Sequence, residues 1–178
     1  TLAALIDCFI KHGQIDEAVA MFKTMQSCGV SPNLVVYTTI IDCLCKAGRL
    51  GEAMNVFSFL VAKRVKLNVC TYTTMINGLC RAGKLNDSVE LIKKMEESGC
   101  SPDDITYNTI IKGFLHTNEV SRAVEFVSIM TSKGFADDDY TSALFLELLT
   151  SPNVSDDVKA ELQEYFGIKT CWYAALTN

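Results

Sequence analysis

Four basic side chains recur at a fixed spacing. They stand 35 residues apart and are Lys11, Lys46, Arg81 and His116. Cations at a constant pitch suit the phosphates of an extended nucleic-acid strand, because each phosphate carries a negative charge. Cations also stabilise the C-terminal end of a helix through its dipole. Contact with a phosphate backbone and helix-end charge are therefore both open interpretations of this series.

The side chains that could carry catalysis lack the spacing that catalysis needs. His12 and His116 are the only histidines, and neither begins an H-x-E motif. The zinc-ligand motif C-x-x-C and the nucleophile motif G-x-S-x-G are both absent from the sequence. Cys43 and Cys45 fall within one amphipathic helix, at a spacing that does not suit shared metal ligation. We expect no catalytic residue, no metal and no cofactor, and hence no enzyme in this segment.

The overall composition narrows the class of protein further. A net charge of −5 disfavours a general basic field for nucleic acid, but allows a few cations along one groove. The sequence contains no run of 18 apolar residues, so we expect no membrane span. Most of the eight cysteines fall at repeat positions, such as Cys8 with Cys43 and Cys45 with Cys80. We expect them to fill apolar helix faces in a reducing compartment, without disulfides.

The elements that position these side chains repeat with the same 35-residue period. Three segments align without a gap: VVYTTIIDCLCKAGRLGEAMNVF, CTYTTMINGLCRAGKLNDSVELI and ITYNTIIKGFLHTNEVSRAVEFV. Apolar spacing predicts a first helix at about residues 35–46 and a second at about 50–62, with Ala47-Gly48 between them. Small residues such as Ala53 on the second helix allow close antiparallel packing. A period in this range predicts a solenoid of stacked helix pairs.

The period also predicts the organisation of the chain. We expect a partial repeat at 1–33, repeats at 34–68, 69–103 and 104–138, a C-terminal capping unit at 139–166, and a disordered tail at 167–178. The capping unit contains a first helix at 140–149 and a shorter second helix at about 155–166, interrupted by Pro152. Because the chain starts within a repeat, we expect it to be the C-terminal fragment of a longer protein.

The unit pattern V-x-Y-T-T-I-I-D-x-L-C-K-A-G-R-L-x-E-A, with G-x-S-P-[ND] at its end, resembles the pentatricopeptide repeat (PPR) family. The resemblance covers residues 1 to about 149 and is closest to the pure-repeat (P) class. It implies a right-handed α-solenoid that binds single-stranded RNA in a mitochondrion or plastid, one base per repeat, with the RNA 5′ end towards the protein N-terminus. It also implies roles in RNA stabilisation, processing or translation, with protein partners that act on the bound RNA.

In this family the fifth and the last residue of each repeat select the base. Applied here, the base-selecting pairs are Thr38 with Asn68, Thr73 with Asp103, and Asn108 with Asp138. Aspartate only accepts hydrogen bonds and suits the imino N–H of guanine or uracil, whereas asparagine also donates and suits the ring nitrogen of adenine or cytosine. By resemblance the three repeats read 5′-AGU-3′. The alternative is a tetratricopeptide-type array that binds peptides, in which nothing would restrict these positions to Thr/Asn and Asn/Asp.

The family also implies roles for the second and the thirteenth positions. The second-position residues sandwich each base and are Val35, Cys70, Ile105 and Tyr140. Packing against the next unit is the alternative interpretation of Val35 and Ile105. The thirteenth-position residues contact the RNA backbone and are the four members of the cation series. Two departures from the family pattern stand out: Arg64 and Leu67 replace the expected glycine and proline, and the three acids at 137–139 would repel phosphate.

Overall fold

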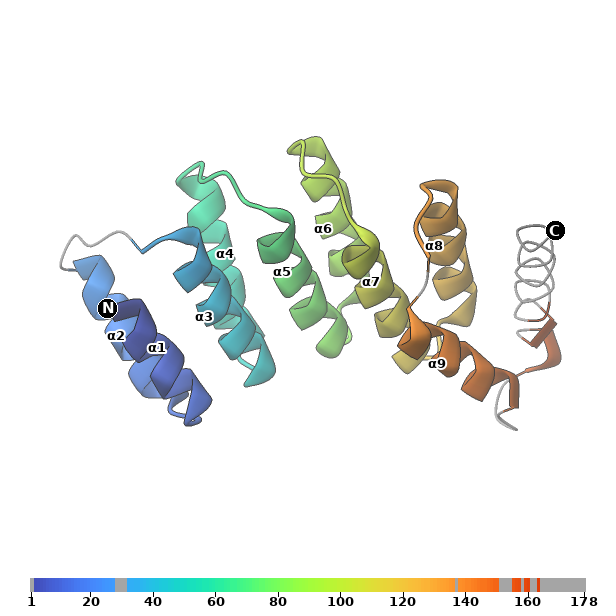
Figure 1. The fold of residues 1–178 in the computed structure, drawn as a ribbon, viewed down its shortest axis with the longest axis horizontal. Coiled ribbons are helices and arrows are strands. Elements are labelled where there is room, and N and C mark those ends of the chain that lie inside the picture. The colour runs from blue at the N-terminus through green and yellow to red at the C-terminus, as the bar shows by residue number, and fades with distance from the viewer. Residues whose placement is uncertain are drawn as a thin grey trace. The chain divides into compact units, whose positions relative to one another are not determined.

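The structure, a computed structural model, describes residues 2–27, 32–136, 138–150, 155–157, 159, 160 and 163. These residues form helices and connecting turns and contain no strand, so the chain is all-α as predicted (Figure 1). The helices are α1 (Leu2–Lys11), α2 (Ile15–Ser27), α3 (Leu34–Lys46), α4 (Leu50–Ala62), α5 (Val69–Arg81), α6 (Leu85–Glu97), α7 (Asp104–His116), α8 (Val120–Ser132) and α9 (Asp139–Thr150).

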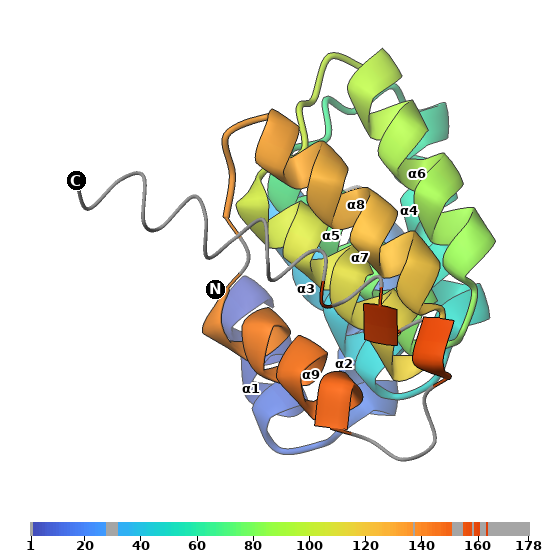
Figure 2. The same ribbon diagram turned by 90° about the vertical axis from the view of Figure 1, so that its right-hand side faces the viewer.

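The chain divides into two compact units. The first unit, Thr1–Pro102, contains α1 to α6, and the second, Asp103–Asn178, contains α7 to α9. In the first unit the helices pair in sequence order, and α3 and α5 also pack side by side. In the second unit α7 packs against both α8 and α9 (Figure 2). Each unit therefore places first helices next to one another, as the 35-residue period requires.

The helix bounds reproduce the sequence period. The first helices α3, α5 and α7 begin at residues 34, 69 and 104, and the second helices α4, α6 and α8 begin at residues 50, 85 and 120. Every one of these six helices has 13 residues. The helices predicted at about 35–46, 50–62 and 140–149 are confirmed.

Side chains at the ends of the repeats explain why the first helices start where they do. The side chains of Asn33, Asn68 and Asp103 cap α3, α5 and α7 by accepting a hydrogen bond from a backbone N–H three residues later, over 3.1, 2.9 and 2.8 Å. An N-cap of this type contributes about 1 kcal/mol to helix stability. The sequence pattern of asparagine and aspartate at these positions is thus a capping pattern.

The turns within and between helix pairs need left-handed backbone conformations. Gly48 has φ of 75°, and in the equivalent place of the second unit Asn118 has φ of 62°. Arg64 adopts φ of 54° where the next repeat has Gly99 at 79°. Glycine adopts this region without cost, and asparagine more readily than most residues, whereas arginine is strained there. The chain therefore keeps the turn before Asn68 although Arg64 departs from the family pattern.

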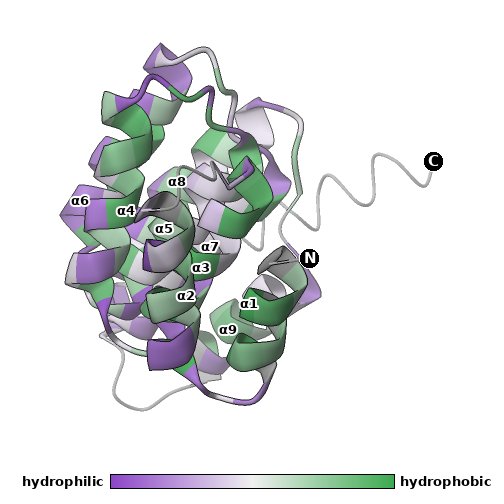
Figure 3. Cartoon of the chain, turned by 90° about the vertical axis from the view of Figure 1, so that its left-hand side faces the viewer, coloured by the Kyte–Doolittle hydropathy of each residue, from purple (hydrophilic) through white to green (hydrophobic). Residues whose placement is uncertain are grey.

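The core of the first unit lies between its helix layers. Ile40, Ile41 and Leu44 of α3 and Ile76 of α5 are buried, and so is Ala53 of α4. Ala53 and its equivalents Ala18, Ser88 and Ala123 all have no exposed surface, which fits the close helix approach predicted from their size. Figure 3 shows hydrophobic and hydrophilic residues on the same helices, as amphipathic packing requires. Within the described residues, no helix is both long and apolar enough to cross a membrane.

Residues after α9 are described at only six positions. The second helix expected at about 155–166 falls largely outside the described residues, and the tail expected at 167–178 falls wholly outside them. Both remain predictions.

Candidate nucleic-acid interface

In the first unit, a short chain of hydrogen bonds joins the two predicted base-selecting residues of repeat 34–68. The hydroxyl oxygens of Thr38 and Thr71 lie 2.8 Å apart, and the Thr71 hydroxyl donates to Asn68 Oδ1 over 2.8 Å. The backbone N–H of Thr71 donates to the same oxygen over 2.9 Å. The buried hydroxyl of Thr71 thereby holds Thr38 and Asn68 in fixed relation. This role of Thr71 was not predicted from the sequence, although threonine recurs at 71, 106 and 141.

The two polar atoms of the Asn68 side-chain amide have different surroundings. Its Oδ1 is used by the cap and by Thr71, whereas its Nδ2 makes no hydrogen bond to any residue that the structure describes. The residue is exposed, so the two N–H donors of Nδ2 are open to a ligand. The capping role also corrects an argument from sequence. Capping by itself favours asparagine and aspartate at these positions, so their presence does not by itself exclude a peptide-binding array.

The second unit contains the pair of repeat 104–138, and there Asn108 is buried. Its Nδ2 donates to the carbonyl oxygens of Asp104 (3.0 Å) and Ala136 (3.3 Å), and its Oδ1 accepts from the Asp138 N–H (3.1 Å) and the Thr141 hydroxyl (3.0 Å). Its side chain is 4% exposed, and these four bonds use the whole capacity of a primary amide. Asn108 thus holds Asp138 and Thr141 in place, and its role as a base selector stays a prediction.

Both carboxylate oxygens of Asp138 have partners. Oδ1 accepts from the backbone N–H of Thr141 over 2.8 Å, and Oδ2 accepts from Lys112 Nζ over 2.5 Å. Burial opposes ionisation of Asp138, but the hydrogen bonds from Lys112 and Thr141 outweigh it and lower the pKa of the carboxyl. Lys112 neutralises Asp138, so one of the three acids expected to repel phosphate is paired, and the repulsion expected from residues 137–139 stays a prediction. Asp137 lies outside the described residues.

The pair of repeat 69–103 is divided between the two units. Thr73 is half-buried on α5 of the first unit. In the second unit Asp103 Oδ1 caps α7 by accepting from the Thr106 N–H (2.8 Å) and hydroxyl (2.7 Å). Oδ2 of Asp103 makes no hydrogen bond to the described residues. The expected pairing of Thr73 with Asp103 stays a prediction.

The residues predicted to sandwich bases lie at the starts of the first helices and face solvent. Val35 is 69% exposed, Ile105 63% and Tyr140 53%, and Cys70 is also exposed. Such exposure is unfavourable for large apolar side chains and leaves their surfaces available to an aromatic base. It disfavours the alternative in which Val35 and Ile105 pack against the next unit.

The cation series lies at the last residue of the first helices, as predicted. Lys46 closes α3 and forms a 2.6 Å ion pair with Asp42 on the same helix, with both side chains largely solvated. Arg81 closes α5, is exposed, and has no salt bridge to any residue that the structure describes. His116 closes α7, with its ring centroid 6.4 Å from that of Tyr140. Lys11 closes α1, but its side chain lies outside the described part of the chain.

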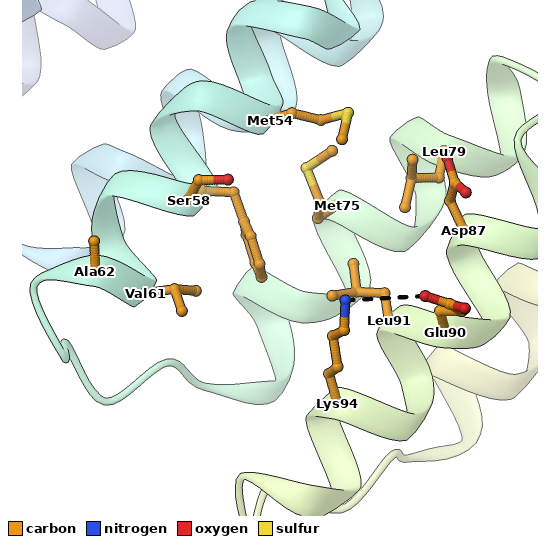
Figure 4. A pocket seen from close by; sticks show the side chains of 11 residues that line it. Met54, Ser58, Val61, Ala62, Met75, Leu79, Asp87, Glu90, Leu91 and Lys94 are labelled. Carbon is orange, nitrogen blue, oxygen red and sulfur yellow. Dashed lines mark ion pairs between the residues drawn. The ribbon is translucent and has the colours of Figure 1, made fainter.

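A separate apolar groove of about 540 Å³ lies between α4, α5 and α6. Met54, Phe57 and Val61 of α4 line it together with Met75 and Leu91 (Figure 4). Charged lining residues come from α6, where Glu90 and Lys94 form an ion pair at 4.0 Å. None of the predicted RNA-contacting residues lines this groove.

The cysteines and acidic residues do not form a metal centre in the described part of the chain. Burial raises the pKa of the Cys45 and Cys80 thiols to about 11, so both remain protonated and unreactive at neutral pH. They fill helix faces as predicted. Cys8 is exposed, unlike its equivalent Cys43, which corrects the expectation that both fill a helix face.

Solved structures share the fold of this chain. PPR10 from maize, in complex with an 18-nt psaJ RNA element, is 22% identical with a TM-score of 0.74, over 92% of this chain and 25% of PPR10. The PPR domain of Arabidopsis thaliana protein-only RNase P 1, in complex with tRNA, is 18% identical with a TM-score of 0.71, over 93% of this chain and 89% of that domain. The nuclear protein-only RNase P 2 of the same plant is 15% identical with a TM-score of 0.72, over 92% of this chain and 37% of that protein.

These similarities establish the helical-repeat solenoid fold, and this chain spans a quarter of the length of PPR10. No curated protein sequence matches the chain. The sequence pattern of the PPR repeat family matches residues 1–45, 32–81 and 67–116, and that of the PPR repeat matches residues 105–135. Because these matches together span residues 1–135, the chain belongs to the pentatricopeptide repeat family.

Proposed function

We propose that this chain binds single-stranded RNA in a sequence-specific manner, with one base per repeat and a preferred core of 5′-AGU-3′. The observation that carries the proposal is that only one of the two polar atoms of the Asn68 amide is hydrogen-bonded to the protein. Its Oδ1 is fixed by capping α5, and its Nδ2 is left open towards a ligand. A polar group held rigidly by the protein and unpaired on its other side is suited to reading a base edge, because little conformational entropy is lost on binding.

The same use of one oxygen for capping would let two residue types select two different bases. At repeat 34–68, the free Nδ2 of Asn68 would donate to N1 of adenine. At repeat 69–103, Asp103 Oδ2 would accept from N1–H of guanine. Both residues cap a helix through Oδ1, so the protein keeps its fold whichever base it reads. Val35, Cys70, Ile105 and Tyr140 would supply the stacking surfaces, and the aromatic surface of Tyr140 would be worth roughly 1–3 kcal/mol to the base that it stacks.

Family relationships support a place for this function in the cell. PPR10 and protein-only RNase P 1 are plant proteins whose structures contain RNA. By family resemblance, we place the chain in a mitochondrion or plastid, where it would stabilise or process a transcript or promote its translation. Protein partners would act on the RNA that it holds. The chain itself contributes binding and no catalytic step.

The test is a calorimetric titration of the 178-residue chain with a short RNA that contains AGU. Three readable repeats offer few contacts against the cost of ordering a flexible strand, so we expect a dissociation constant of about 1 µM or weaker. The same RNA in a duplex, or with CCC in place of AGU, should bind more weakly still. Nanomolar binding, or equal binding of all three RNAs, would mean that the interface lies elsewhere.

A second candidate function is peptide binding in the groove between α4, α5 and α6. The observation in its favour is the exposed apolar surface of α4, where Met54 is 38% and Val61 51% exposed. The two functions separate cleanly, because groove residues and predicted RNA-contacting residues do not overlap. Met54→Lys should leave RNA affinity unchanged if RNA binding is the function.

A further inference from the structure

The repeat in the second unit carries a cation that earlier repeats lack. Lys112 stands where the two preceding repeats have Asp42 and Asn77. Its Nζ lies 2.5 Å from Asp138 Oδ2 and 5.1 Å from the ring centroid of Tyr140. The two members of the pair keep 26% and 45% of their side-chain surface exposed. The ion pair is therefore open to a ligand on one side and lies against the ring proposed to stack a base.

This pair presents a hydrogen-bond donor beside an acceptor. The Lys112 ammonium has three N–H donors, of which Asp138 takes one, and Asp138 Oδ2 keeps a second lone pair. Uracil and guanine present the complementary edge, an imino N–H next to a keto oxygen. Cytosine and adenine present the reverse, a bare ring nitrogen next to an amino group. A keto base would thus make two hydrogen bonds here, whereas an amino base would face donor against donor and acceptor against acceptor.

The fifth-position residue of this repeat has no hydrogen-bonding group to spare. All four positions of the Asn108 amide are bonded to protein, and the side chain is buried. Base discrimination at this repeat then depends on groups that remain accessible. Among the described side chains around Asp138, Lys112 is the one with unused donors in contact with the carboxylate.

We propose that Lys112 is a specificity-determining residue, which together with Asp138 reads the imino and keto edge of uracil or guanine at this repeat. Asn108 then acts as a positioning residue that holds the backbone N–H of Asp138. The inference rests on the proposed function, because it assigns the third base of the bound RNA. It also accounts for the single repeat in which position nine carries a positive charge.

The test is a competition between RNAs with AGU and AGC cores, measured for the parent chain, Lys112→Met and Lys94→Met. Uracil and cytosine have the same size, so their difference reports the hydrogen-bonding edge. We expect Lys112→Met to reduce the preference for AGU over AGC about fivefold, the worth of one net hydrogen bond. Lys94→Met makes the same charge change in a solvent-exposed ion pair of α6 and should leave the preference unchanged.

Three results would overturn the inference. Equal weakening of both RNAs by Lys112→Met would assign Lys112 to a phosphate, and no effect at all would leave a purely structural ion pair. A parent chain that binds RNA without preferring AGU over AGC would remove the base contact. All three leave RNA binding itself intact, whereas failure of the parent chain to prefer single-stranded AGU over its duplex contradicts the proposed function.

A modified base keeps the test decisive if Lys112→Met loosens the second unit. Replacing O4 of the third base by sulfur, as 4-thiouridine, weakens the acceptor without changing the protein. The parent chain should bind the 4-thiouridine RNA more weakly than the uridine RNA, and Lys112→Met should bind the two equally. A parent chain that is indifferent to this replacement would contradict contact between Lys112 and O4.

Discussion

Two cations of one series have different surroundings, and the difference predicts different contributions to RNA binding. Lys46 forms an ion pair with Asp42, whereas Arg81 has no salt bridge among the described residues. A phosphate that approaches Lys46 must compete with a carboxylate at 2.6 Å, although both partners are well solvated and the pair is worth at most about 1 kcal/mol. Arg81 meets no such competition.

We therefore expect Lys46→Gln with Arg81→Gln to weaken all single-stranded RNAs alike. Phosphates carry no sequence information, so the base preference should stay constant. The slope of log affinity against log salt should become shallower by about 1.4, at about 0.7 per phosphate contact. Arg81→Gln alone should account for more of the loss than Lys46→Gln alone.

Titrations of AGU and CCC RNAs at several salt concentrations measure both quantities. Lys63→Gln, on the connector that follows α4, is the matched control for loss of a surface charge. An altered base preference with an unchanged salt slope would remove Lys46 and Arg81 from the backbone-contacting role.

Residues that follow the repeat were predictable from the sequence, whereas those that break it were not. The placement of the cation series at helix ends follows from its period, and all four members close a helix. Lys112 was missed because no other repeat has a cation at its position, and its partner Asp138 lies 26 residues away. The burial of Asn108 was also missed, because it depends on backbone groups of Ala136 and Asp138 that no side-chain pattern reveals.

At the scale of elements, the approach of α3 to α5 depends on a residue without a side chain. A Cβ placed on Gly78 would overlap Cys45 Sγ and lie 2.9 Å from Cys45 Cβ. Gly78 is buried within α5, where glycine otherwise costs about 1 kcal/mol relative to alanine. The close contact between the two first helices therefore outweighs helix propensity at this position.

We expect Gly78→Ala to lower the free energy of unfolding by about 1 kcal/mol. An overpacked core costs about 1–3 kcal/mol, which exceeds the propensity gain of about 1 kcal/mol. Denaturant unfolding followed by circular dichroism measures the change. Gly51→Ala is the matched control, because a Cβ added to Gly51 of α4 would meet no atom within 4 Å, so this substitution should gain stability.

A second substitution identifies the cause. In a Cys45→Ala background the sulfur is gone but the Cβ of residue 45 remains 2.9 Å away, so Gly78→Ala should cost less stability there than in the parent chain. An equal loss in both backgrounds would mean that Gly78 is needed for a reason other than its contact with Cys45.

Helix bounds were the part of the fold that the sequence predicted best, because the same apolar and glycine positions recur in several aligned copies. The role of the repeat ends was predicted incompletely. Asn68 and Asp103 were expected to face a base, and the structure adds that each also caps a helix. Asparagine and aspartate suit both helix capping and base contact, so a sequence pattern cannot separate the two roles. The residues after α9 match no other copy, which leaves their predicted organisation without support from the period.

At the scale of the whole molecule, the proposed function depends on repetition. A single repeat would offer one polar edge, one stacking surface and one cation, which is too little to order an RNA strand alone. Successive repeats add their contributions, so affinity and specificity grow with repeat number while each repeat stays replaceable. The net charge of −5 is compatible with this proposal, because the cation series lies at one end of the first helices.

Because the repeats are equivalent, the last residues of two repeats can be exchanged without altering the rest of the protein. Asn68→Asp combined with Asp103→Asn preserves net charge. It also preserves both N-caps, because asparagine and aspartate cap helices equally well. The partner residues Thr38 and Thr73 are both threonine and need no change. The corresponding exchange in the RNA turns AGU into GAU, which has the same composition and charge.

The central claim, that the last residue of each repeat reads one base, is tested most directly by competition between AGU and GAU RNAs. The parent chain should prefer AGU, and the doubly exchanged chain should prefer GAU by a similar margin, on the order of 1–3 kcal/mol per base by analogy with polar base contacts in DNA. General electrostatics and stability cancel, because charge, caps and RNA composition are the same on both sides. An exchanged chain that still prefers AGU, or that no longer distinguishes the two RNAs while the parent does, would show that Asn68 and Asp103 cap helices without reading bases.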